Sequence, residues 1–532
     1  MKTNTLSITL LLVISFSFQK LSAQTVEVHQ GDVFKSKRLS YVNQILFKDN
    51  KEMLAIRTNR TLLGKRSDYV ESFNNNMNFR SNHEISLPDK DLEIENYIYV
   101  DNQAYIFMSK YDKDKGINTL YGSKLNEKGR IDQNFIEIVN VEVDKKREMN
   151  FFDVTQSIDS TKFLITIVPK QRKEDKAKLS FLVLDHEMKE HDNIMVDFPF
   201  KREQFGMNDY HLDKDGNIHI LGNVTIEETR KNKLFGSTVE REARIFSFYK
   251  DDDELVEYNL AFDNGNKDDT YLNQIRLGLD KLGRLQCTGF YSEKKGSFMK
   301  GVFNCTIDID KKEAVNIDSQ VFTDKFIEQF LTDRQIKRKK RRKAKNKDPR
   351  FDHLSNFSIR KMAYKEEGGF YILAEYYNYY VTTTTDANGN IKTTHHYIYG
   401  DIMAINVNED NSVEWFTRIP KYQHSTNDGG RYSGIARAID NNNSLHIIFN
   451  EHRKNAKTLV PQKRKNAVGK KTITVLVSID EEGDATKTPL MPAKEGKTIV
   501  APKAHFQNAS NELILYATRG KKSRFINVII KD

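Results

Sequence analysis

Cysteine is nearly absent from this chain of 532 residues, and tryptophan occurs once. With only Cys287 and Cys305, a fold held together by several disulfides is excluded. The two cysteines lie in consecutive strand-like runs, "RLQCTGFYS" and "GVFNCTIDI", so we expect them nearly opposite each other in a hairpin. A disulfide and two buried thiols both fit this arrangement, because sequence does not fix a register to one residue.

Long apolar runs are missing after the N-terminus, where one extends from Leu6 to Phe18. Lys2 precedes this run and the small pair Ser22 and Ala23 follows it, which is typical of a secretory signal peptide. We therefore expect residues 1–23 to be cleaved off after Ala23. No cysteine follows that site to anchor a lipoprotein, and no later segment could span a bilayer. The predicted location is periplasmic, cell-surface-associated or extracellular.

Most of the chain has no excess of either charge. The formal net charge is +10, but the segment from Arg334 to Arg350 holds eleven Lys and Arg against one acid, Asp348. The remaining 515 residues therefore sum to about zero. The high isoelectric point describes one segment and not a generally basic, nucleic-acid-binding surface.

Motifs of common enzyme classes are also missing. The chain has no His-Glu-x-x-His, Gly-x-Ser-x-Gly, Walker or Cys-x-x-Cys pattern. His395 and His396 are adjacent, so on a strand they would point to opposite faces and could not share a metal ion. "DKDGN" at Asp213 resembles the start of a calcium loop but lacks the downstream glutamate. We predict no metal site and no cofactor.

A repeated hairpin is the main feature that is present. Its clearest copies are "YHLDKDGNIHILGN" (210–223) and "LGLDKLGRLQCTGF" (277–290), where apolar residues alternate on both sides of an Asp/Gly turn. Six weaker copies occur, and most are followed by a second hairpin. Four short strands per repeat predict an all-β fold, with residues 24–532 forming one β-propeller domain of about eight four-stranded blades. Seven is the alternative. The last repeat has three strands, and the N-terminal "TVEVHQGDVF" could supply the fourth.

The pattern Asp213, Gly216, Asn217 and Gly222 resembles that of bacterial secreted beta-propeller repeat proteins. The resemblance implies a fold, and propellers of this kind serve unrelated functions.

Two repeats carry extensions. Residues 323–353, between the fifth and sixth repeats, form a basic helical insert in which Thr323 is the expected N-cap. Residues 376–399 in the sixth repeat form a projecting hairpin rich in Tyr and Thr, and its Asn388-Gly389 pair predicts a type I′ turn.

Propeller topology places both extensions on one face, together with the basic loop 453–471, because all three follow the second or fourth strand of a repeat. Acidic turns such as "KDDDE" (250–254) gather on the opposite face. Tyr377 and Tyr379 of the projecting hairpin could stack on sugars or simply pack across the two strands of the hairpin. Candidate binding residues are Lys337, Arg338, Lys339, Lys340, Arg341, Arg342, Lys343, Lys463, Arg464, Lys465, Tyr377 and Tyr379.

Polar residues near the starts of the innermost strands would ring the mouth of a central channel. Its carboxylates, with His505, are the catalytic candidates, since glycosidases use a pair of carboxyl groups as acid and base. The alternative is a polar mouth that only holds water. The ring comprises Asn43, Glu95, Asp153, Asp209, Arg276, Arg360, Arg437 and His505.

The sequence thus predicts a non-enzymatic binding or scaffold protein that engages an acidic partner through its basic face. The partner would be an anionic glycan, a lipid head group, an acidic protein or another envelope component. Nucleic-acid binding is disfavoured because the chain is expected to be exported and has no nucleic-acid recognition motif. The alternative is a channel-mouth enzyme that acts on a carbohydrate or other polymer.

Overall fold

The computed structural model describes residues 25–37, 39–60, 66–132, 135–143, 152–230, 237–258, 260, 271–292, 298–347, 353–460, 465–467, 471–492 and 498–531. The signal peptide predicted for residues 1–23 lies outside these ranges. Strands dominate, and two short helices, α1 (Asp324–Gln329) and α2 (Asp333–Lys343), form the main departure from them.

The first half of the described chain forms four antiparallel sheets, here numbered 1 to 4, in which each strand pairs with the next along the chain. Sheet 1 contains β3 (Ser40–Lys48), β4 (Glu52–Arg60), β5 (Arg66–Asn74) and β6 (Phe79–Glu84). Sheet 2 contains β7 (Leu92–Val100), β8 (Gln103–Asp112), β9 (Ile117–Leu125) and β10 (Ile136–Glu142). Sheet 3 contains β11 (Asp153–Gln156), β12 (Phe163–Ile167), β13 (Lys176–Leu184) and β14 (Glu190–Lys201). Sheet 4 contains β15 (Phe205–Leu212), β16 (Ile218–Arg230), β17 (Ser237–Tyr249) and β18 (Glu254–Tyr258).

The second half forms sheets 5 to 8 with the same order. Sheet 5 contains β19 (Tyr271–Leu279), β20 (Leu285–Ser292), β22 (Gly301–Asp308) and β23 (Glu313–Val321). Sheet 6 contains β25 (Phe357–Tyr364), β26 (Phe370–Thr385), β27 (Ile391–Val407) and β28 (Val413–Ile419), and β29 (Gln423–Thr426) also pairs with β27. Sheet 7 contains β30 (Ala436–Ile439), β31 (Leu445–His452), β32 (Thr472–Ile479) and β33 (Ala485–Pro492). Sheet 8 contains β34 (Ile499–Ala509), β35 (Glu512–Arg519), β36 (Lys522–Lys531) and β1 (Thr25–Gln30), and β2 (Phe34–Lys35) pairs with β36. The short β21 (Phe298–Met299) pairs with β24 (Leu354–Ser355).

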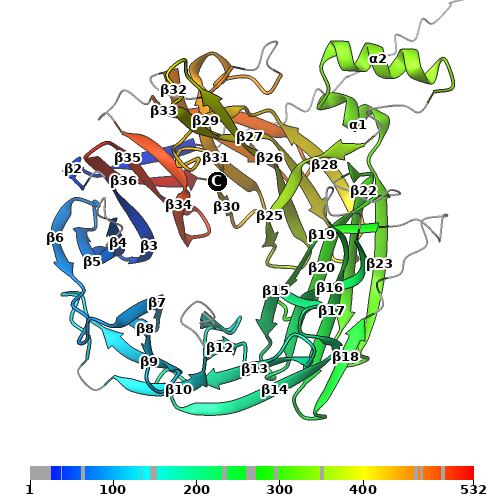
Figure 1. Cartoon of the computed structure of the whole chain (residues 1–532). Coiled ribbons are helices and arrows are strands. Elements are labelled where there is room, and N and C mark those ends of the chain that lie inside the picture. Colours follow the sequence, from blue (N-terminus) through cyan, green and yellow to red (C-terminus); the bar gives the residue numbers. More distant parts are fainter. Residues whose placement is uncertain are drawn as a thin grey trace, which may run out of the picture.

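These sheets are arranged around a central opening, in a propeller-like manner (Figure 1). The first strand of each sheet lies nearest the opening. In sheet 8, β1 is the outer strand, so both ends of the described chain share one sheet. The predicted all-β architecture of four-stranded antiparallel sheets is confirmed.

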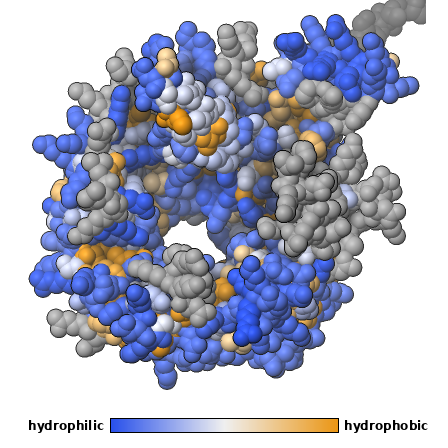
Figure 2. Space-filling view, in the orientation of Figure 1, coloured by the Kyte–Doolittle hydropathy of each residue, from blue (hydrophilic) through white to orange (hydrophobic). Residues whose placement is uncertain are grey.

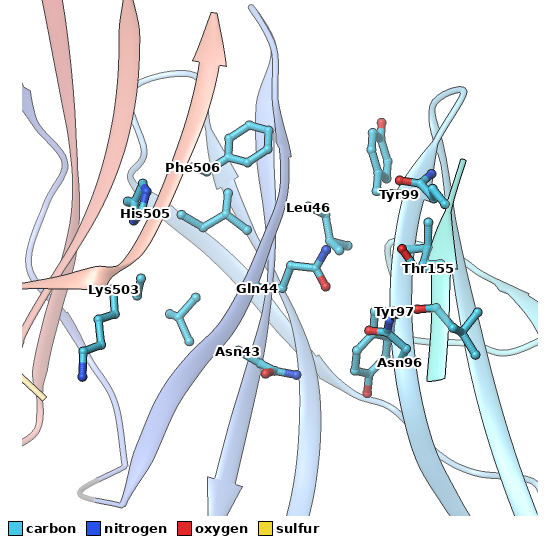
Figure 3. A pocket seen from close by; sticks show the side chains of 16 residues that line it. Asn43, Gln44, Leu46, Asn96, Tyr97, Tyr99, Thr155, Lys503, His505 and Phe506 are labelled. Carbon is cyan, nitrogen blue, oxygen red and sulfur yellow. Dashed lines mark hydrogen bonds between the residues drawn. The ribbon is translucent and has the colours of Figure 1, made fainter. Parts of the chain in front are cut away.

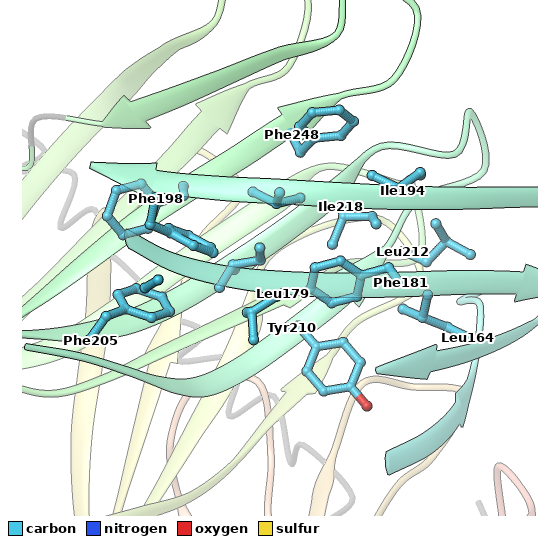
Figure 4. Close-up of a cluster of buried hydrophobic side chains, with 14 of the residues drawn as sticks. Leu164, Leu179, Phe181, Ile194, Phe198, Phe205, Tyr210, Leu212, Ile218 and Phe248 are labelled. Carbon is cyan, nitrogen blue, oxygen red and sulfur yellow. The ribbon is translucent and has the colours of Figure 1, made fainter. Parts of the chain in front are cut away.

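Apolar side chains fill the space between neighbouring sheets. Figure 4 shows one such cluster between sheets 3 and 4, where Phe181 of β13 and Ile218 of β16 have no exposed surface. Burial of a side chain of this size contributes about 1.5–3 kcal/mol. Since sheets pack on each other through both faces, the inner strands are held around the opening.

One type of turn recurs between consecutive strands. In the turn that begins at Asp213, the carboxylate Oδ1 accepts the backbone N–H groups of Asp215 and Asn217, at 2.9 and 2.8 Å. Gly216 closes the turn with a φ of +92°, a left-handed conformation that glycine adopts readily. The "DKDGN" segment is therefore a hairpin turn whose carboxylate binds its own backbone.

The type I′ turn predicted at Asn388-Gly389 is wrong. Only Gly389 has a positive φ, and the loop runs over the five residues between Thr385 and Ile391. Asp386 Oδ1 accepts the N–H groups of Asn388 and Asn390, at 2.9 Å each, as in the turn at Asp213. The aspartate cap, which precedes the Asn-Gly pair, determines the turn type.

Candidate functional site

Irregularities in the inner strands shape the channel wall. The pairing register shifts between Val42 and Gln44 in β3, between Ile94 and Asn96 in β7, and between Ile359 and Lys361 in β25. An extra residue in one strand changes which side chains point to each face. Polar residues on either side of these bulges therefore reach the channel.

Two adjoining cavities, of about 480 and 690 Å³, follow the channel and share Asn96 and Thr155. Figure 3 shows the smaller one, with Gln44 and Asn96 on one side and Lys503 and His505 on the other. Six of the eight residues expected at the mouth line these cavities, namely Asn43, Asp153, Asp209, Arg276, Arg360 and His505.

The other two expected residues have specific partners. Glu95 accepts a hydrogen bond from the Ser109 hydroxyl, and it does not line either cavity. Burial raises the pKa of this carboxyl. Arg437 Nη1 lies 3.4 Å from His505 Nε2, so Arg437 borders the site through that ring.

Asp209 is held in its charged form. Burial opposes ionisation, but His211, whose Nε2 lies 3.6 Å away, the backbone N–H of Tyr210 at 3.0 Å and the nearby Arg276 together keep the pKa of Asp209 below its usual range. Asp209 is therefore suited to act as a base or an anion and not as a proton donor at neutral pH.

Lys361 and Lys503 are cavity-lining cations that the sequence reasoning missed. Burial by the channel wall lowers the pKa of both amines, and the neighbouring Arg437 lowers that of Lys361 further. Their places in the sequence, Lys361 one residue after Arg360 and Lys503 two residues before His505, could have indicated that they line the channel. This indication could not be used because the bulges shift the alternation of facing residues.

Tyr399 connects the channel to the projecting hairpin. Lys503 Nζ donates to its hydroxyl at 2.6 Å, and the Arg360 guanidinium lies 5.8 Å from its ring centre. Behind it, the fully buried Lys421 pairs with Glu375 at 2.5 Å, and Glu375 also accepts from Arg360 at 3.0 Å. Arg360 is thereby fixed between a carboxylate and an aromatic ring.

The hairpin of β26 and β27 carries rings on both faces. On one face Tyr377 packs against Tyr399, with ring centres 4.9 Å apart, and Tyr379 packs against Tyr397 at 5.2 Å. Tyr379 remains 45% exposed. This row, Tyr399, Tyr377, Tyr397 and Tyr379, is called the tyrosine face below.

The two adjacent histidines point to opposite sides of the ribbon, as the sequence predicted. His395 bonds to the Tyr379 hydroxyl at 2.7 Å, whereas His396 stacks on Tyr380 and lies 3.1 Å from His424 of β29. Within the described ranges, no group of three or more His, Cys, Asp or Glu side chains is placed to hold a metal ion.

The basic insert forms two capped helices instead of the single helix expected. Thr323 caps α1 by accepting the N–H of Phe326, and Thr332 and Gln335 form a reciprocal capping box at α2. Phe326 and Ile327 are buried against sheet 6, which anchors the pair of helices beside the ring in Figure 1.

Within α2 one candidate residue has a structural role. Lys339 is 3% exposed and its ammonium contacts Asp324 at 2.8 Å and Glu328 at 3.8 Å, so it ties α2 to α1 and is not free to bind a partner. Lys343 also contacts Asp324, at 3.4 Å. The candidates Lys337, Arg338, Lys340 and Arg341 are exposed, Lys343 is exposed as well despite its contact with Asp324, and Arg342 is half-buried.

The third basic segment is described in part, and the candidates Lys463 and Arg464 lie outside the described residues. Lys465 is half-buried. Asn466 exchanges hydrogen bonds with the backbone of His424, and the Ala467 N–H donates to the Tyr422 carbonyl. The segment thus lies beside β29 and the hairpin.

Buried chains of Asp, His and hydroxyl groups occur in two sheets, and sequence reasoning missed them. His446 lies 2.8 Å from Asp440 and 2.9 Å from the Ser478 hydroxyl, and His219 links Asp213 to Ser247 in the same way. The signal was a histidine six residues after the turn aspartate. Both histidines have no exposed surface, so these groups bind one another and cannot reach a substrate.

The two cysteines are direct cross-strand partners in β20 and β22, as the hairpin pattern suggested. Both are free thiols with no exposed surface. Burial, together with the neighbouring Cys305, raises the pKa of Cys287 well above its ordinary value. A thiol in this environment is an inert core group.

Comparison with known proteins gives no family for the chain. No family model and no curated protein matches it. Among solved structures, it is similar to prolyl oligopeptidase B from Galerina marginata (TM-score 0.39, 9% identity), covering 92% of this chain and 56% of the peptidase. It is also similar to the WD40 domain of SCAP from fission yeast (0.34, 10%; 94% and 98% covered) and to a protein of unknown function from Dyadobacter fermentans (0.30, 7%; 94% and 99%). No described helix is long and apolar enough to cross a membrane.

Proposed function

We propose that this chain is a non-enzymatic binding protein, built as a propeller of eight blades, that acts outside the cytoplasm and engages an acidic partner. Eight four-strand sheet paths around one opening support the blade number. The signal-peptide pattern of residues 1–23 supports export.

The observation that carries the binding role is the way in which α2 is held. Its capping box, the inward Lys339 and the buried anchor of α1 fix the helix, while Lys337, Arg338, Lys340 and Arg341 remain exposed. Cations on a fixed helix bind an anionic surface with a more favourable free energy than cations on a flexible segment. The reason is that less side-chain and backbone freedom is lost on binding.

The test replaces these four residues together by glutamine. Binding to heparin, to a polyglutamate peptide and to vesicles with phosphatidylglycerol is measured at increasing salt. We expect one of these probes to lose at least about tenfold in affinity, with a weaker dependence on salt, because four exposed charges are removed.

A matched control removes the same charge from the opposite edge of the sheets, with Lys51, Lys214, Lys281 and Lys311 replaced by glutamine. These residues lie in turns between the first and second or the third and fourth strands. If the control variant loses as much affinity as the α2 variant, net charge alone explains binding and the role of α2 is wrong.

A channel enzyme acting on a carbohydrate is the second candidate, because Asp153 and Asp209 line the same cavity. Its test is hydrolysis of a panel of polysaccharides. Asp153→Asn and Asp209→Asn should abolish any turnover that the α2 variant retains. Turnover that survives both substitutions contradicts this candidate.

A further inference from the structure

The channel wall holds cations that lack acidic partners. Within the described ranges, Lys361, Arg437 and Lys503 form no ion pair with a carboxylate, although ion pairs are common elsewhere in the molecule. Asp209 attracts Lys361, and Glu375 and Asp428 attract Lys503, each from beyond ion-pair distance. Asp209 lies 3.6 Å from His211, and Glu375 pairs with Lys421 at 2.5 Å. Like charges enclosed by protein repel one another, and a bound anion would relieve this repulsion.

His505 adds polarity to the site without adding charge. Its Nδ1 lies 2.8 Å from the Pro502 carbonyl, which can only accept a hydrogen bond, so Nδ1 carries the proton. Nε2 is then the acceptor that faces Arg437 at 3.4 Å. Burial and the two neighbouring cations lower the pKa of His505 to about 4. The ring therefore orients the Arg437 guanidinium at neutral pH.

The tyrosine face begins where the cation-lined wall ends. Lys503 is bonded to Tyr399, and Arg360 lies 5.0 Å from the ring centre of Tyr377. From there the row continues to the exposed Tyr379 along the projecting hairpin. Figure 2 shows the central hollow and, beside it, the region of the β26–β27 hairpin, where apolar and polar residues mix.

We propose that the channel is a second binding site, separate from α2, which takes the carboxylate or sulfate group of an acidic glycan. The anionic group lies beside Lys361 and Arg437, and sugar rings of the same chain pass Lys503, which lines the adjoining cavity, and stack along the tyrosine face. Amide and hydroxyl groups of Asn43, Gln44, Asn96 and Thr155 line the cavities and suit the hydroxyls of a sugar.

The geometry favours a glycan over the other acidic ligands. A flat bilayer would meet the projecting hairpin before it reached the channel. An acidic peptide would use the cations but has no flat apolar face for the tyrosines, whereas the C–H face of a sugar ring fits an aromatic side chain. The inference does not depend on α2.

The experiment measures binding of acidic hexasaccharides by calorimetry. Hexamers of galacturonate, of mannuronate and of sulfated galactose are compared with neutral maltohexaose, a hexaglutamate peptide and inorganic sulfate. We expect at least one acidic hexamer to bind at least about tenfold more tightly than maltohexaose, hexaglutamate or sulfate. Comparison of the carboxylated and sulfated hexamers identifies the anionic group.

Two pairs of variants locate the site. Lys361→Gln and Arg437→Gln should each weaken binding about tenfold, while Lys214→Gln, on the opposite edge, leaves it unchanged. Tyr379→Ala should weaken binding about fivefold or more, whereas Tyr380→Ala removes an equally large, 39% exposed ring from the other ribbon face and should have no effect.

The outcomes separate this inference from the function proposed above. Loss of hexamer binding in the Lys361 and Tyr379 variants, with full binding by the α2 variant, supports the channel site. The inference is overturned if no acidic hexamer binds, if hexaglutamate binds as tightly as the best hexamer, or if only the α2 variant loses affinity. In that last case the role of α2 stands alone.

Discussion

The buried chain of Asp440, His446 and Ser478 shows how single residues secure the inner turns. Burial disfavours the charge of Asp440, but hydrogen bonds from His446 and from the backbone of Ser444 and Asn442 hold its pKa below the usual range. In sheet 5 a glutamine takes the place of the histidine and makes the equivalent hydrogen bonds. Gln286 donates to Asp280 at 3.1 Å and accepts from Thr306 at 3.0 Å.

This equivalence predicts the effect of two substitutions. His446→Gln should lower the free energy of unfolding by at most about 1 kcal/mol, because an amide can satisfy both neighbours. His446→Leu should lower it by about 2–4 kcal/mol, because the buried carboxylate of Asp440 loses the hydrogen bond from His446 to its Oδ2. Urea denaturation at neutral pH measures both, and equal losses would contradict the prediction. In the wild type, the stabilisation from Asp440 should persist above about pH 4 and decline as the pH falls through its lowered pKa.

At the scale of elements, the sequence predicted hairpins better than their details. Two copies with an Asp-x-x-Gly turn were enough to recognise the repeat, and the same turn appears at Asp213 and Asp386. The type I′ turn predicted at Asn388-Gly389 was wrong because the prediction considered only these two residues and left out Asp386, which caps the loop. In the insert, Thr323 was identified as a cap, but Thr332 begins a second helix that places the basic run on a fixed support.

The candidate site was predictable only in outline. Polar starts of inner strands identified Asp153, Asp209 and His505 as channel residues, since each could be counted back from its turn. Lys361 and Lys503 were missed because the inner strands pair irregularly near them. β25 has one extra residue between Ile359 and Lys361, and the pairing of β34 is interrupted between Val500 and His505. The alternation of polar and apolar residues along a strand predicts which side chains share a face of the sheet. The positions of bulges, which shift this alternation, depend on tertiary packing and cannot be read from a single sequence.

At the scale of the whole molecule, the outer strand of sheet 8 joins the two ends of the described chain. The last repeat has three strands of its own, and β1 takes the fourth place beside β36, with Val28 opposite Val528. Val26 and Val28 pack against the core of this sheet. The cleavage site expected after Ala23 precedes β1, so cleavage there would leave this strand intact.

This arrangement predicts that β1 stabilises the molecule. Val28→Asp should lower the free energy of unfolding by about 2–3 kcal/mol, because it places a charge against an apolar core. His29→Asp introduces the same charge one residue away, on an exposed position, and should change stability by about 0.5 kcal/mol or less. Thermal unfolding of both variants measures the difference. Equal effects would show that β1 does not contribute through its core face.

The pairing of β1 with β36 also places Thr25 directly opposite Lys531. A linker of a few residues would join these two positions without crossing the fold, and a new chain end could then be opened at an exposed turn such as that at Asp386. The order of the sheets along the chain is thus one of several circular permutations that the same packing would accept.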